Sequence, residues 1–137
     1  HLTKEQKKKY NQNRIRIKGS EKNWYAYIQK GVFSSKRLYK SDFFIITGYP
    51  EKAEIAKHNT QLIVKNYLLG TLIYYLGLGI ATGIENPIGM VIGFGGAGYF
   101  YYDYNVKKLE GASLKDAKII AEEYNNDLMQ RIFNEND

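Results

Sequence analysis

Two apolar segments, residues 62–84 and 88–102, follow one another with only residues 85–87 between them. As a helix at about 1.5 Å per residue, the first segment reaches roughly 34 Å, enough to cross a hydrocarbon core of about 30 Å. The second reaches roughly 22 Å and spans only if the residues beyond its ends lie in the interfacial layers or the bilayer thins. The pattern predicts a two-helix transmembrane hairpin over residues 62–104. The alternative is a buried helical hairpin of a soluble protein, although the polar flanks are too short to enclose one.

Before the hairpin, apolar and polar residues alternate with a period of two, which is typical of β-strands. Residues 14–18 and 24–29 are expected to form strands around a polar turn, and Val32-Phe33 and residues 37–39 could add short ones. Ser41 suits the N-cap of a short helix over residues 43–46, which Gly48 can close in the left-handed conformation. These elements predict a small β-rich unit with one helix, residues 13–61.

A helix is expected to begin after Pro50 and to run from Glu51 without a break into Leu62, so that it leads directly into the first apolar segment. Residues 1–12 are polar and rich in lysine. They are expected to be a basic mobile tail or a short helix docked on another part of the structure.

Residues 105–137 are expected to form a linker and an amphipathic helix. Ser113 and Asp116 resemble a capping box that opens a helix ending near Phe133. Apolar residues recur along it at spacings of three and four, which places them on one stripe. We expect this stripe to dock on a partner; it consists of Leu114, Ala117, Ile120, Ala121, Tyr124, Leu128 and Ile132.

Small residues mark the expected contact between the two apolar helices. If the helices are antiparallel about Asn86, residues equally distant from it lie at the same depth, which pairs Gly83 with Gly89 and Gly79 with Gly93. Small residues let membrane helices approach closely, so these four glycines and Ala97 are the predicted packing residues. Residues 93–98 also match the G-x-G-x-x-G dinucleotide pattern, but no βαβ unit accompanies them and no cofactor is expected.

Aromatic residues gather near the end of the hairpin that is distal to the turn, as they do at membrane interfaces. The predicted interface residues are Lys65, Tyr67, Tyr101, Tyr102 and Tyr104. Tyr74 and Tyr75 lie deeper, where a buried hydroxyl without a partner costs about 1–3 kcal/mol. We therefore expect their partners on the opposite helix or on another subunit.

Positive charge is concentrated at the N-terminus: residues 1–61 hold 14 Lys and Arg but only 5 Asp and Glu. Such a segment beside a membrane hairpin could bind anionic lipid headgroups. A solvated tail is an equal alternative. We expect no nucleic acid partner, because no recognised nucleic-acid module is visible.

The sequence shows no set of residues suited to catalysis. The chain has no cysteine, and its two histidines, His1 and His58, are far apart and outside any metal-binding spacing. Thiolate chemistry and cysteine-based metal sites are therefore excluded, and a metal site with histidine ligands is not expected. We expect a protein that is not an enzyme and has no catalytic, cofactor or metal site.

Four elements, in this order, resemble a set of uncharacterised small envelope proteins of Bacteroidetes-type bacteria. They are residues 39–41, residues 49–53 with their Pro-Glu-x-Ala element, the glycine-rich hairpin, and residues 121–125 with Tyr-Asn. In those proteins a short β unit leads to a helix, two glycine-rich membrane segments and a final helix. The resemblance covers roughly residues 24–128 and implies an exported or envelope location, but no activity.

These expectations combine into an α+β membrane protein, a structural or accessory subunit of a cell-envelope complex that binds other membrane protein subunits as an oligomer or hetero-complex. A pore-forming or transport component built from several hairpins is the alternative. Both termini are expected on the same side. Lysines at the outer ends of both apolar segments favour the cytoplasm. The first residue is not methionine, so either a leader was cleaved or the chain was trimmed; a cleaved leader would, with the resemblance, favour the periplasm.

Overall fold

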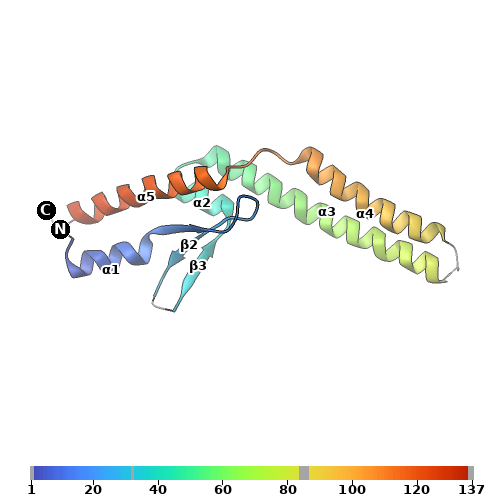
Figure 1. The fold of residues 1–137 in the computed structure, drawn as a ribbon, viewed down its shortest axis with the longest axis horizontal. Helices are drawn as coiled ribbons and strands as arrows, with labels where there is room; N and C mark the ends of the chain where they lie inside the picture. The colour runs from blue at the N-terminus through green and yellow to red at the C-terminus, as the bar shows by residue number, and fades with distance from the viewer. Residues whose placement is uncertain (1, 32, 84–86, 136–137) are drawn as a thin grey trace. The chain divides into compact units, whose positions relative to one another are not determined.

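The computed structural model describes residues 2–31, 33–83 and 87–135, and its fold combines α-helices with one β-sheet (Figure 1). The chain divides into two compact units, one made of residues up to 56 and from 111, the other of residues 57–110. In chain order the elements are α1 (Lys4–Asn13), β1 (Ile15–Lys18), β2 (Tyr25–Gln29), β3 (Ser35–Leu38), α2 (Lys40–Ile46), α3 (Pro50–Gly83), α4 (Ile88–Lys107) and α5 (Leu114–Asn134).

The first unit contains an antiparallel sheet in the order β1-β2-β3. Its first two strands confirm the period-two pattern. Gly19 has φ +113° in the turn between them, and a Cβ there would lie 2.3 Å from the Asn23 carbonyl oxygen, so the turn requires glycine. The third strand covers residues 35–38. Phe33 lies outside any strand, and Val32 lies outside the described residues.

A short helix over residues 43–46 was expected with Ser41 as its N-cap. The helix is present as α2, but the N-cap is wrong, because α2 begins at Lys40 after Tyr39, which makes no side-chain cap bond. Phe43 and Phe44 of this helix are buried and pack it against the sheet. Gly48 ends this turn with φ +85°, as predicted. The Tyr49 amide then bonds the Phe44 carbonyl at 2.7 Å.

The N-terminal segment forms helix α1. Of the two expectations for residues 1–12, the structure therefore supports the short docked helix over the mobile tail. Thr3 and Gln6 make a capping box. Gln6 is buried, and its Nε2 donates to the Ile132 carbonyl oxygen of α5 at 3.1 Å, while Lys9 pairs with Glu135. Both termini of the first unit are therefore held by contacts between α1 and α5.

The apolar stripe of α5 docks within its own unit. Its N-terminal capping box forms as predicted, with Ser113 and Asp116. Ala117, Ile120 and Ala121 belong to the same buried cluster as Ile15 and residues of the sheet, with Leu114 and Tyr124 packed against it. The prediction that this stripe docks on a partner subunit is wrong for these buried residues, because the small sheet needs a helix to cover its apolar face. Ile132 is also buried, and Leu128 is half-buried.

Two polar side chains complete this packing. Asn125 of α5 acts as an extra partner for the edge strand β1: its Oδ1 accepts from the Ile15 amide and its Nδ2 donates to the Ile15 carbonyl oxygen, both at 2.8 Å. Trp24 is buried edge-on against Phe43 and Phe44, and its Nε1 donates to the Ala112 carbonyl oxygen at 3.0 Å.

The capping box of α5 predicts a specific dependence of stability on pH. Hydrogen bonds from the Ser113 hydroxyl and amide lower the pKa of Asp116. A carboxylate with a lowered pKa in the folded state contributes full stability above its ordinary pKa of about 3.9, and the contribution is lost as pH falls through the lower folded-state value. Asp116→Asn keeps an acceptor that does not titrate. Thermal unfolding followed by circular dichroism should therefore show a flatter loss of stability at acid pH in the variant, and identical profiles would contradict the assignment.

The second unit contains residues 57–83 of α3 and all of α4. Helix α3 begins at Pro50 and runs without a break, as predicted. Among the described helices, only α3 is long and apolar enough to cross a membrane, and little of its apolar stretch is buried inside the chain. Helix α4 does not meet this criterion, because it contains many glycines and tyrosines and a polar end, Asp103 to Asn105. The prediction of two apolar spans over residues 62–104 is therefore wrong as a pair: in the described part of the chain, α3 has the length and composition of a span, and α4 does not.

Candidate functional site

Helices α3 and α4 lie side by side along a seam of small residues (Figure 1). Gly77 is in the middle of it: a Cβ there would lie 2.4 Å from the Gly89 carbonyl oxygen and 2.5 Å from the Gly93 amide nitrogen. A Cβ on Gly89 would lie 2.4 Å from the Ala81 amide nitrogen. Real side chains cannot occupy such space, so the approach of the two backbones depends on these glycines.

The predicted register of this seam is wrong. Gly89 and Gly93 lie in it, but a Cβ on Gly79 or Gly83 would meet no atom of the described residues within 4 Å. Gly93 was paired with Gly79, yet it contacts Tyr74 and Gly77, a difference of about one helical turn. Counting from the turn estimates depth, but it does not say which side of each helix faces the other.

A heptad spacing marks the true seam in the sequence. On α3 it passes through Asn66, Gly70, Ile73, Gly77 and Ala81, and on α4 through Gly89, Gly93, Gly96, Phe100 and Asp103. Steps of four and three residues keep one side of a helix towards its neighbour. This spacing was the available signal, whereas the predicted pairs were chosen only by their distance from the turn. Ala97 lies beside the seam, where a Cβ on Gly70 would be 3.8 Å from its Cα.

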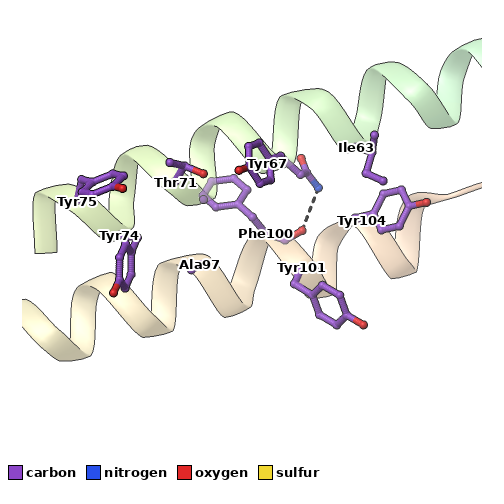
Figure 2. Close-up of a pocket in the computed structure, with 11 residues that line it drawn as sticks. Ile63, Tyr67, Thr71, Tyr74, Tyr75, Ala97, Phe100, Tyr101 and Tyr104 are labelled. Carbon is purple, nitrogen blue, oxygen red and sulfur yellow. Dashed lines mark hydrogen bonds between the residues drawn. The ribbon is translucent and has the colours of Figure 1, made fainter. Parts of the chain in front are cut away.

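A groove with a volume of about 500 Å³ runs beside this seam between the two helices (Figure 2). No residue that lines it is charged. Tyrosines predominate, and the ring of Tyr74 packs edge-on against Tyr75 and Phe94 at 5.7 and 5.5 Å between centroids. The lining consists of Ile63, Asn66, Tyr67, Gly70, Thr71, Tyr74, Tyr75, Ala97, Phe100, Tyr101 and Tyr104.

Asn66 crosslinks the helices at one end of the groove. It is 5% exposed, and its Nδ2 donates to the Phe100 carbonyl oxygen at 3.0 Å and to Asp103 Oδ2 at 3.1 Å (Figure 2 draws the first bond). The other oxygen of Asp103 pairs with Lys107 Nζ at 2.5 Å. Because the Asn66 amide group bonds two residues of α4 at once, these contacts hold the two helices in one register. Asn66 was not among the residues predicted for a site, because its role depends on contacts with the neighbouring helix.

Three predicted interface residues line the groove: Tyr67, Tyr101 and Tyr104. Lys65 and Tyr102 are exposed outside it. Among the described residues, the hydroxyls of the groove tyrosines have no hydrogen-bond partner on either helix. The partners expected for Tyr74 and Tyr75 on the opposite helix are therefore absent from the described part of the chain.

A second hollow, of about 590 Å³, lies in the first unit between the end of α2 and α5. It is polar, with Asp127 and Arg131 in its lining. Nearby, the Tyr49 hydroxyl bonds Glu123 at 3.0 Å, and this contact raises the pKa of Tyr49. Within the described ranges, no three His, Cys, Asp or Glu side chains gather as metal ligands. The tyrosine groove is thus the better-formed candidate for binding, and its lining residues suit recognition of an apolar partner with a few hydrogen bonds.

Comparison with protein-family models, with curated proteins and with solved structures finds no match to this chain.

Proposed function

We propose that this chain is a non-enzymatic structural or accessory subunit of a membrane protein complex in the bacterial cell envelope. Helices α3 and α4 anchor it, and the tyrosine groove receives an apolar transmembrane helix of a partner subunit. The observation that carries the proposal is the groove itself: it is apolar, uncharged and lined by phenol hydroxyls that lack partners among the described residues.

The outer surface of the helix pair supports membrane insertion. Large apolar side chains are exposed on it, among them Leu68, Leu72, Leu76, Val91 and Phe94. A continuous exposed apolar surface of this kind marks a membrane or a protein interface. Helix α4 has 20 residues, about 30 Å of helix, so its length, although not its hydropathy, matches a span. In the proposal it lies in the bilayer beside α3, with Gly89, Gly93 and Gly96 on the seam.

The groove predicts a partner helix and not a small polar ligand. Within a bilayer, helices associate through close packing and interhelical hydrogen bonds. An incoming helix would bury the tyrosine rings and offer backbone or side-chain oxygens to their hydroxyls. We propose a location in a membrane of the cell envelope, with both termini on the same side. The periplasmic side is favoured slightly over the cytoplasmic side, and this preference rests on the resemblance described above. Protease digestion of α5 in cells with a permeabilised outer membrane tests it, and protection would favour the cytoplasm.

Purification in mild detergent tests the partner directly. Thr71→Trp should fill the groove, whereas Leu72→Trp places the same side chain on the outer surface, where Leu72 is exposed. We expect a protein to co-purify at fixed stoichiometry with the wild type and with Leu72→Trp, and to be lost with Thr71→Trp. Equal recovery with both variants would contradict a role for the groove.

A pore-forming or transport component is the second candidate, and the polar network from the buried Asn66 through Asp103 to the exposed Lys107 favours it. Polar groups inside a membrane helix pair often mark a path for ions or protons. Conductance of the reconstituted chain that changes with Asp103→Asn would support this candidate, and liposomes without conductance would remove it.

A further inference from the structure

The three-stranded sheet presents one face to the core and the other away from it. Ile17, Ala26 and Leu38 are opposite one another in register, and all three belong to or pack against the buried cluster. The alternate residues form the outer face. Lys18 is opposite Tyr25, and Tyr27 is opposite both Arg16 and Arg37. We call these five residues, Arg16, Lys18, Tyr25, Tyr27 and Arg37, the basic sheet face.

This face carries positive charge that is not neutralised. None of the strand residues is acidic, and none of the three cations is in an ion pair within the described part of the chain. The Arg37 guanidinium lies 4.4 Å from the Tyr25 ring centroid, and Lys18 Nζ lies 5.2 Å from that of Tyr27. Such contacts orient a cation and leave its charge in place.

An exposed phenylalanine lies at one end of the same sheet. Phe33 is fully exposed at the end of the β2–β3 hairpin, which extends beyond the helices of its own unit (Figure 1). The amides of Lys30 and Gly31 bond the Ser34 carbonyl oxygen at 2.9 and 3.2 Å and hold this end in a turn. Lys30 and Lys36 flank it in the sequence.

We propose that the basic sheet face binds acidic phospholipid headgroups, with Phe33 entering the boundary between headgroups and acyl chains. Apolar side chains beside a cluster of cations are the usual composition of surfaces that bind anionic membranes. Single-stranded nucleic acid fits less well, because bases need free aromatic rings for stacking, and Arg37 and Lys18 already cover Tyr25 and Tyr27. The inference rests on the proposed function only in requiring a membrane nearby.

A single cysteine can test this contact, because the chain has none of its own. Ser34→Cys in the otherwise intact chain carries a fluorophore beside Phe33, and lipids with a spin label near the headgroup quench it. In nanodiscs of phosphatidylcholine with phosphatidylglycerol we expect strong quenching that added salt reverses. Lys18→Gln or Arg37→Gln should each lower the ratio of docked to free hairpin about fivefold. A label at the exposed Asn126 of α5, the helix that covers the opposite face of the sheet, serves as the control and should be quenched much less.

Each other outcome is decisive. Equal quenching in pure phosphatidylcholine would overturn the proposal, as would its absence in both kinds of nanodisc. Displacement of the hairpin from the acidic nanodiscs by a trace of single-stranded RNA would favour nucleic acid instead. A second label, at Leu72 on α3, reports bilayer insertion separately: quenching there without docking at Ser34 would refute this inference and leave the anchoring proposal intact.

Discussion

Replacing Gly77 by leucine is expected to force α3 and α4 apart and to destabilise the helix pair by about 3 kcal/mol, the upper part of the range for overpacked contacts. Even the first carbon of the new side chain would meet backbone atoms of Gly89 and Gly93 at 2.4 and 2.5 Å. Backbone atoms cannot move aside as a flexible side chain can. Thermal unfolding in detergent, followed by circular dichroism, measures the loss.

Gly79→Leu is the matched control on the same helix. It makes the same chemical change two residues away, where a Cβ meets no atom of the described residues within 4 Å. We expect little effect beyond a small gain from replacing glycine in a helix. Equal destabilisation by both substitutions would mean that the seam does not pass through Gly77.

Replacing Phe43 by alanine should have the largest effect on the first unit, about 3–5 kcal/mol, as for other buried aromatic side chains. Phe43 is fully buried and packs against Trp24 and Phe44, with centroids 5.7 and 5.0 Å away. Trp24 is the one tryptophan of the chain. Its fluorescence during denaturation therefore reports this core directly.

Phe133→Ala removes the same side chain from the surface of α5, where it is 48% exposed. We expect a change within about 0.5 kcal/mol, as for most surface substitutions. If both variants shift the Trp24 transition by the same amount, the assigned core is incorrect.

Local signals in the sequence predicted most elements of the first unit. The alternation of apolar and polar residues predicted β1 and β2, and the spacing of Ser113 and Asp116 predicted where α5 begins. Both signals depend only on residues that are neighbours in the chain, so they can be recognised without knowledge of the fold. Ser41 failed as an N-cap because the packing of Phe43 and Phe44 decides where α2 lies, and packing depends on distant residues.

The candidate site was harder to predict for the same reason. An amphipathic stripe shows that Ala117 and Ile120 need a covering surface, but it does not say whether another chain or the sheet of the same unit provides it. In the helix pair, composition revealed the glycines and tyrosines. Their division between seam and groove depends on helix rotation, which Gly77 and Asn66 determine through contacts across the pair.

The central claim, that α3 and α4 lie in a membrane, is tested most directly by sedimentation of the purified chain with and without detergent. We expect the chain to remain with membranes until detergent extracts it, and to aggregate when detergent is removed, because the exposed apolar surface of the helix pair then has no partner. A monodisperse monomer in aqueous buffer without detergent would contradict the claim.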